Sequence, residues 1–250
     1  MTSPSMLLLQ IRGVANEMAM LQEQVCFREL SGFGSPRLST INLVTEPEIS
    51  WADVDPHDVL LIGGAGSHTV TREYDFTAPL AAVVRRWVRE GRPFLGSCWG
   101  HQFLAWALGG AVITDHDRGE VGTFDIHLTE AGRRDPLLAG LPDTFPVHLG
   151  HHDVVSELPD GMVELAYSEL GRNQVIRVAG LPIYGTQFHC EMTMARMSER
   201  LRMYSSEYLA GDDSEDHISD ILRPAPDAEG LLCRFLAAVA DTAAARSVVR

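Results

Sequence analysis

Residues 92–108 read RPFLGSCWGHQFLAWAL, and this stretch decides the fold. The apolar residues before Gly96 predict a short buried strand, and the apolar run after Cys98 predicts a buried helix. The turn between them has the Gly-x-Cys-x-Gly spacing of a nucleophile elbow, with cysteine in the place of the nucleophile. Such a turn is so tight that side chains at Gly96 and Gly100 would clash with the sheet and the helix.

The predicted elbow also suits the chemistry of a thiol. It places Cys98 just ahead of a helix N-terminus, where the helix dipole and free N–H groups favour a thiolate. The backbone N–H of Trp99 then points to where an oxyanion would form during attack on a carbonyl. A buried structural cysteine in a glycine-rich turn is the alternative, since buried cysteines are common. The five residues alone leave both interpretations open.

Outward from the elbow, apolar runs alternate with helical patterns. This alternation predicts an α/β fold with a mostly parallel central sheet and helices on both of its faces. Strands are expected at residues 6–11, 38–44, 58–62, 92–96 and 181–188, with shorter strands of a small antiparallel layer at 124–128, 163–168 and 174–178. Helices are expected at residues 17–29, with Met18, Leu21, Val25 and Phe27 facing the core, at 76–90, with Asp75 as the N-cap, and at 99–108.

The last part of the chain has a helical character. Helices are predicted at residues 193–208 and 227–243, with an acidic loop at 210–217 between them. The second helix has an apolar side made of Leu231, Leu232, Phe235, Leu236 and Val239. We therefore expect a catalytic domain at residues 1–192 and a helical C-terminal extension at 193–250 that packs on the same domain.

Composition and charge exclude several classes of protein. The hydrophobic share of 45% and the charged share of 22% are ordinary for a globular protein. A net charge of −14 argues against a general nucleic-acid binder and against docking on an anionic membrane. No stretch approaches the roughly 18 apolar residues of a membrane span, and no basic segment precedes the first apolar run as in a signal peptide. The four cysteines have irregular spacing without a CxxC pair, which predicts reduced thiols and a cytoplasmic location.

A histidine and a glutamate lie two residues apart at the end of the last predicted strand. His189 ends this strand and Glu191 lies two residues on, so both side chains project to the same side of an extended backbone. Glu191 can accept a hydrogen bond from one imidazole nitrogen while the other nitrogen faces a thiol. The alternative is that His189 and Glu191 have no catalytic role and simply cap a strand end at the surface. A metal site built from His148, His151, His152 and His189 is disfavoured, because adjacent histidines in a turn make a poor tetrahedral set, so no metal or cofactor is expected.

Four motifs occur in a fixed order along the chain. They read Gly-Gly-Ala at residues 63–65, Gly-Ser-Cys-Trp-Gly-His-Gln at 96–102, Gly-His-His-Asp at 150–153 and His-Cys-Glu at 189–191. Together they resemble the signatures of the class I (triad) glutamine amidotransferase family, over roughly residues 7–192. The elbow and triad are similar to those of the GMP synthase glutaminase domain. The resemblance implies a flavodoxin-like fold for the sheet and its helices.

The resemblance also implies roles for individual residues. Cys98 would attack the γ-carbonyl of glutamine to form a γ-glutamyl thioester, His189 would protonate the departing ammonia and then activate water, and Glu191 would orient His189. The remaining positions that match the family motifs are Gly64 and Trp99, as N–H donors of the oxyanion hole, and Gln102, Gly150, His151 and His152, as contacts of the bound glutamine.

Two of the motifs depart from the usual pattern, at Cys190 and at Gly150-His151-His152, which stands in place of Ser-His-Gly. Cys190 replaces the proline that normally separates the base from the acid and presets an extended backbone; its side chain is expected to point away from the triad. His152 stands where the family has a glycine and adds bulk beside the glutamine pocket. His101 is similar to the histidine in the Cys-Phe-Gly-His-Gln elbow of plant γ-glutamyl peptidases, which are stand-alone triad proteins.

No segment of the sequence matches a synthase that would consume ammonia. Neither a phosphate loop nor a Ser-Gly-Gly-x-Asp-Ser adenylation motif is present. Three functions therefore stay open: a glutaminase that delivers ammonia to a separate acceptor protein, a stand-alone hydrolase of γ-glutamyl peptides, and an inactive relative with a binding or regulatory role.

Overall fold

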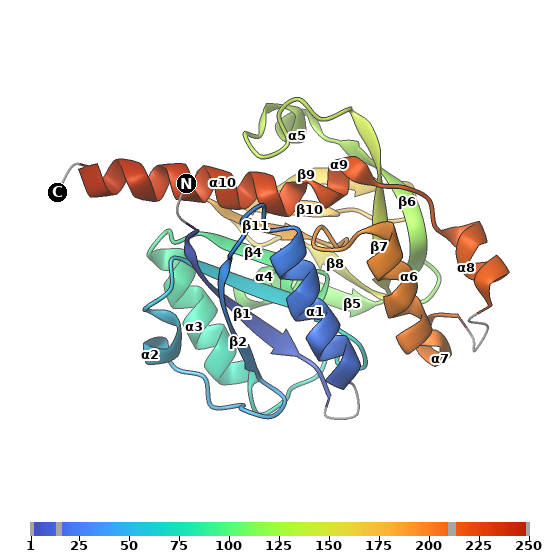
Figure 1. The fold of residues 1–250 in the computed structure, drawn as a ribbon, viewed down its shortest axis with the longest axis horizontal. Coiled ribbons are helices and arrows are strands. Elements are labelled where there is room, and N and C mark those ends of the chain that lie inside the picture. The colour runs from blue at the N-terminus through green and yellow to red at the C-terminus, as the bar shows by residue number, and fades with distance from the viewer. Residues whose placement is uncertain (1–2, 14–16, 210–213, 249–250) are drawn as a thin grey trace.

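The parallel half of the central sheet has the strand order expected of a flavodoxin-like fold. The computed structural model describes residues 3–13, 17–209 and 214–248, with side chains described up to residue 241. The strands β2 (Arg37–Asn42), β1 (Ser5–Ile11), β3 (Val59–Ala65), β4 (Phe94–Ser97) and β11 (Ile183–Thr186) lie side by side and parallel in that order (Figure 1). In such sheets ligands bind beyond the carboxyl ends of the strands, where β3, β4 and β11 here end next to one another.

The antiparallel strands continue the same sheet and do not form a layer of their own. Beyond β11 follow β10 (Val175–Val178), β9 (Met162–Ser168), β6 (Glu120–Leu128) and β7 (Thr144–His151), which complete a nine-stranded sheet. A separate two-stranded sheet pairs β5 (Ala111–Thr114) with β8 (Asp153–Glu157). The antiparallel strands predicted for this part of the chain are therefore present, but they widen the central sheet.

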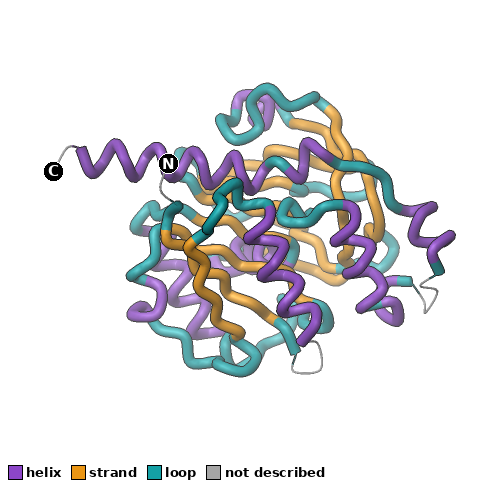
Figure 2. The backbone as a smooth tube through the Cα atoms, in the orientation of Figure 1, coloured by secondary structure: helices purple, strands orange, loops and turns teal. Residues whose placement is uncertain are grey.

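Helices cover both faces of this sheet, so its central strands β1, β3, β4 and β11 are buried on both sides. In β1, Met6 and Leu8 join the core under α1 (Glu17–Glu29), α9 (Pro226–Glu229) and α10 (Leu231–Val248). Leu7 and Leu9 point the other way, into the core under α3 (Thr77–Arg89) and α4 (Trp99–Ala107). The two helical layers are visible on either side of the strands in Figures 1 and 2. Two shorter helices are α2 (Trp51–Val54) and α5 (Glu130–Arg134).

Helix α1 has the predicted bounds, but it buries a different face. Three positions predicted to face the core are exposed: Met18 (72%), Leu21 (50%) and Val25 (37%). Phe27 is buried as predicted, together with the polar Gln22 and Glu23. The cause is a charge partner elsewhere in the chain, because Glu23 forms a buried ion pair with Arg12 at 2.6 Å, just after β1. An ion pair of this kind holds its carboxylate inside and turns the apolar positions outward.

The C-terminal part is helical, with more interruptions than predicted. Residues 193–208 form α6 (Met194–Met203) and α7 (Ser205–Tyr208), which are separated at Tyr204. The predicted helix at 227–243 is divided into α9 and α10 at Gly230, and its five apolar residues are buried as predicted. Of the predicted loop at 210–217, residues 210–213 lie outside the described residues. Residues 215–217 instead begin α8 (Glu215–Ile221), whose first turn is capped by Ser214.

The N-cap of α3 differs from the predicted one. Phe76, and not Asp75, is the N-cap of α3. Within the described ranges, no helix is both long enough and apolar enough to cross a bilayer.

Candidate active site

The elbow is built as the sequence predicts. Cys98 lies between β4 and α4 with φ 49° and ψ −101°, a backbone conformation that is strained for any residue except glycine. A Cβ atom on Gly96 would lie 2.4 Å from the carbonyl oxygen of Gly100, and a Cβ on Gly100 would lie 2.3 Å from that of Ile62. Both approaches are too close, so the two glycines let strand, turn and helix pack as they do.

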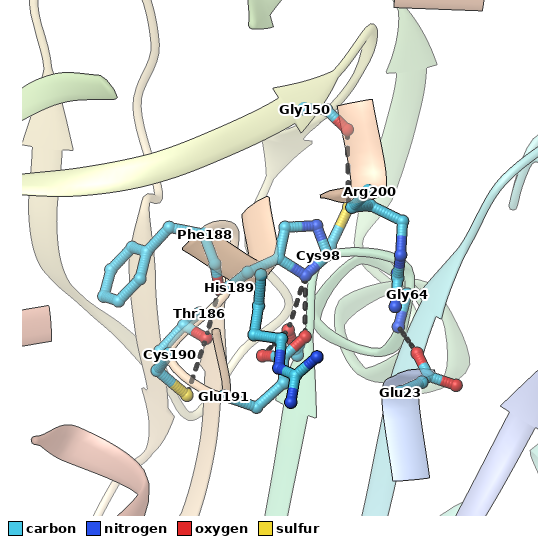
Figure 3. Close-up of polar contacts among 12 residues, drawn as sticks. Glu23, Gly64, Cys98, Gly150, Thr186, Phe188, His189, Cys190, Glu191 and Arg200 are labelled. Carbon is cyan, nitrogen blue, oxygen red and sulfur yellow. Dashed lines mark hydrogen bonds and ion pairs between the residues drawn. The ribbon is translucent and has the colours of Figure 1, made fainter. Parts of the chain in front are cut away.

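His189 and Glu191 meet Cys98 at the carboxyl ends of β3, β4 and β11. The Nδ1 atom of His189 lies 2.7 Å from Oε1 of Glu191, and both side chains are buried (Figure 3). A Cβ atom built on Gly64 would lie 2.9 Å from Cε1 of His189 and 3.7 Å from Cβ of Cys98. Three segments far apart in the sequence therefore converge on one point.

The electrostatics of the pair favour a protonated imidazole. Burial alone would lower the pKa of His189, but the negative charge of Glu191 and the hydrogen bonds to Cys98 and Glu191 outweigh it and raise that pKa to about 9. For Glu191, burial opposes ionisation, but the charge of His189 and hydrogen bonds from His189 and Ser97 hold its pKa below the usual range. At neutral pH this arrangement favours an imidazolium held by a carboxylate, next to the side chain of Cys98.

Two other cysteines, Cys26 and Cys190, lie in surroundings that do not favour a thiolate. Burial raises the pKa of Cys26 to about 12 and that of Cys190 further still. The Cys190 thiol accepts a hydrogen bond from Oγ1 of Thr186 at 3.7 Å and points away from His189, as expected (Figure 3). Cys98 is also the one cysteine that lines the pocket described next.

A pocket of about 500 Å³ opens above Cys98. Its walls come from the loop after β3, the start of α4, the β7–β8 turn and α7. Most of the residues predicted to contact the substrate or its oxyanion are part of the pocket wall. These are Trp99, Gln102, Gly150, His151 and His152. The exception is Gly64, which lies beneath the pocket beside His189.

The predicted donor Gly64 is already engaged. Its backbone N–H donates a hydrogen bond to Oε1 of Glu23 at 3.2 Å (Figure 3). This carboxylate is in turn held by Arg12, whose Nη2 donates to Oε1 at 2.6 Å. The guanidinium of Arg12 also donates to the hydroxyl of Tyr204 at 3.3 Å, which ties the network to the end of α6. The N–H of Gly64 is therefore not free to bind an oxyanion in this structure, whereas Trp99 is the first residue of α4 and has no intrahelical acceptor for its N–H.

Two glutamines connect the elbow to the strand that carries the base. Nε2 of Gln102 donates to the backbone carbonyl of Asp153 at 2.8 Å and to Oε1 of Gln187 at 3.1 Å. Nε2 of Gln187 in turn lies 3.7 Å from Sγ of Cys98. Gln187 was not among the predicted site residues; it lies just beyond the end of β11, two residues before His189.

The histidines around the elbow have different surroundings. His151 is bound into the pocket wall by Glu120, with Nε2 and Oε2 at 3.2 Å. His152 lines the pocket, and its ring stacks on that of Tyr208 with centroids 6.0 Å apart. His101 is fully buried against Gly185, its pKa is lowered to about 3 by desolvation, and it does not line the pocket. His101 therefore does not contact a substrate in this pocket, although its position matches the histidine of the peptidase elbow.

Comparison with known proteins identifies the family. The family model "Glutamine amidotransferase class-I" matches residues 32–203, more than half of the chain. The chain belongs to the class I glutamine amidotransferase family. The family match includes the elbow and the His-x-Glu motif, and no group of histidine, cysteine and acidic residues that could hold a metal ion occurs among the residues that the structure describes.

Individual relatives agree with this family. The glutamine amidotransferase-like protein YfeJ of Salmonella typhimurium is 32% identical over 188 residues, which cover 69% of this chain and 77% of YfeJ. One subunit of the glutamine-hydrolyzing GMP synthase of Methanosarcina mazei is 37% identical over 111 residues, 44% of this chain and 57% of the relative. The matched region thus spans just over half the length of that relative, and 32% of the glutamine-hydrolyzing GMP synthase of Shewanella piezotolerans.

A solved structure shows the same fold. The glutamine amidotransferase of Thermotoga maritima superposes with a TM-score of 0.72 at 21% identity, over 95% of this chain and 99% of that one.

Proposed function

We propose that this chain hydrolyses the γ-carbonyl bond of glutamine, or of a related γ-glutamyl amide, with Cys98 as the nucleophile. His189 would act as the proton shuttle and Glu191 would orient it. The observation that carries the proposal is the buried 2.7 Å pair of His189 and Glu191 beside a cysteine on a strained elbow that opens into a pocket. Nucleophile, base and orienting acid are the three parts that covalent acyl transfer needs.

The proposed reaction has two halves. First the thiolate of Cys98 attacks the γ-carbonyl carbon, the C–N bond breaks, and the proton of the His189 imidazolium completes the departing ammonia. A γ-glutamyl thioester remains on Cys98. In the second half His189 takes a proton from water, the resulting hydroxide attacks the thioester, and the C–S bond breaks to release glutamate and the thiolate.

We propose that the N–H of Trp99 is the main donor to the oxyanion that forms in each half of the reaction. A second donor at Gly64 becomes available only when Glu23 releases it, because one N–H cannot serve the carboxylate and the oxyanion together. Gln102 and the backbone of residues 150–152, with His151 and His152 beside it, are proposed to hold the glutamate part of the substrate, since they line the same pocket as Cys98.

The nitrogen would pass to a separate protein. The Methanosarcina mazei relative is named as one subunit of a GMP synthase, which supports an acceptor carried on another chain. We propose a cytoplasmic setting for this pairing, consistent with four free cysteines.

A second candidate function is a stand-alone hydrolase of γ-glutamyl peptides. The size of the pocket favours it: about 500 Å³ is within the roughly 300–1,000 Å³ typical of drug-sized ligands. Arg72, His116 and Glu207 also line this pocket, so a leaving group larger than ammonia has polar and charged side chains to contact.

One assay distinguishes these functions. The purified chain is incubated with glutamine and, separately, with a γ-glutamyl dipeptide, and glutamate release is measured. The ammonia-delivering function predicts slow release from glutamine alone, and the peptidase function predicts rapid release from the dipeptide. Release from neither substrate, with glutamine still bound in calorimetry, would contradict hydrolysis and identify a binding or regulatory protein.

A further inference from the structure

The hydroxyl of Ser97 contacts the acid of the proposed triad directly. Ser97 is the last residue of β4, immediately before the nucleophile, and it is fully buried. Its Oγ donates a hydrogen bond to Oε2 of Glu191 at 2.7 Å, while Oε1 of the same carboxylate pairs with Nδ1 of His189 at 2.7 Å. Each oxygen of Glu191 thus has a side-chain donor of its own.

A carboxylate at this place needs both donors. Glu191 is fully buried, and an ionised group without water is costly unless its oxygens are hydrogen-bonded. Within the described part of the chain, Ser97 is the side chain that donates to Oε2. Without it, Glu191 could turn about its terminal bond and present the wrong geometry to His189.

The hydroxyl also compensates for a missing constraint. Cys190 occupies the position where a proline would fix the backbone between His189 and Glu191. Ser97 pairs in register with Thr186 at the end of β11, and the N–H of Cys98 donates to the carbonyl of Thr186 at 2.8 Å. A main-chain and a side-chain hydrogen bond therefore link the end of β4, next to the nucleophile, to the end of β11 and the segment after it that contains the base and the acid.

We propose that Ser97 is a positioning residue of the Cys98–His189–Glu191 triad, whose hydroxyl fixes the Glu191 carboxylate so that Oε1 faces the imidazole. The inference rests on the proposed function, in which these three residues act together. The Ser97 hydroxyl takes no part in bond making or breaking in this role; it acts through Glu191, and its Oγ also lies 3.5 Å from Nδ1 of His189.

The direction of its effect on protonation follows from the groups around His189. These are Cys98, Glu191, His148, Arg12, Arg200, Tyr204 and Tyr208, with Cys26 close to Glu191. Of them Glu191 and then Cys98 raise the pKa of His189, against the opposing effect of burial. Removal of the Ser97 hydroxyl lets the Glu191 carboxylate turn away from Nδ1 of His189, which weakens the charge pair and so lowers the pKa of His189 from about 9.

The test compares Ser97→Ala with Ser97→Thr, Glu191→Gln and a matched control, Ser31→Ala. Ser31 is also a buried serine whose hydroxyl donates one hydrogen bond, to the carbonyl of Arg28 at 2.8 Å, but it lies after α1. For each variant we would measure Tm, kcat/KM for γ-glutamyl hydrolysis against pH, and the pH dependence of Cys98 alkylation by iodoacetamide.

Ser97→Ala is expected to lower kcat/KM roughly 10- to 100-fold, the equivalent of one hydrogen bond to a charged group. The basic limb of its pH profile should move down by about one pH unit, in the same direction as in Glu191→Gln. Ser97→Thr keeps the hydroxyl and should restore both. Ser31→Ala should leave the profile in place.

Two results would overturn the assignment. One is a Ser97→Ala profile that coincides with wild type. The other is a loss of activity that tracks Tm alone, without movement of the basic limb or of the alkylation profile. If the wild-type chain hydrolyses neither glutamine nor a γ-glutamyl dipeptide, the proposed function fails, but alkylation of Cys98 still reports whether Ser97 supports the His189–Glu191 pair.

Discussion

Cys98→Ala is expected to lower γ-glutamyl hydrolysis by a factor on the order of 10⁴ to 10⁶, with no loss of stability comparable to a core mutation. The thiol is the group proposed to form the thioester, and Cys98 is the one cysteine among the residues that line the pocket. The measurement is kcat/KM for glutamate release, with unfolding followed in parallel.

Cys26→Ala provides the matched control. Cys26 is equally buried, but it lies on α1 and packs against Met192 and Met197. Its removal should cost some stability and leave turnover within a few-fold of wild type. Equal activity of Cys98→Ala and wild type would show that the elbow is structural and that catalysis, if any, lies elsewhere.

Arg12→Ala is expected to destabilise the fold by about 3–5 kcal/mol, the usual result of leaving one member of a buried ion pair alone. Arg12 and Glu23 are both fully buried, so the carboxylate loses its cation in a place where solvent does not replace it. The same change should loosen the loop at Gly64 and the end of α6, because Arg12 also donates to Tyr204. Chemical denaturation of both proteins measures the difference.

Two further variants distinguish the effect of the ion pair on stability from the effect of side-chain packing. Arg12→Met combined with Glu23→Leu removes both charges at similar volume and should recover much of the lost stability. Arg134→Ala removes an arginine from an exposed pair with Glu130 and should change stability little. A cost for Arg12→Ala as small as that for Arg134→Ala would contradict the buried ion pair.

The parts of the structure that follow from local patterns were predictable from the sequence. The elbow at Cys98 requires two glycines at a fixed spacing, and a sequence records glycine directly. His189 and Glu191 were predicted to meet, but through the alternation of an extended chain; β11 ends at Thr186, and the two side chains meet across a turn at residues 189–192. Their convergence with Gly64 followed because parallel strands all present their carboxyl ends on the same side.

The parts that depend on distant partners were not predictable in this way. Helix α1 has apolar residues at helical spacing, but Arg12 draws Glu23 inward and so exposes Met18 and Leu21. The same carboxylate accepts from Gly64, which the motif alone marked as a free donor. Ser97 carries no signal by itself, because its role appears only when β4 and β11 place it opposite Glu191.

The central claim is that Cys98 forms a covalent bond to a γ-glutamyl group, and covalent labelling tests it most directly. The wild-type chain is incubated with a chloroketone analogue of glutamine, with excess glutamine as competitor, and peptide masses are measured. We predict one equivalent of label on the peptide that contains Cys98, suppressed by glutamine and absent from the peptides that contain Cys26, Cys190 and Cys233. Label distributed over several cysteines, or unaffected by glutamine, would contradict the claim.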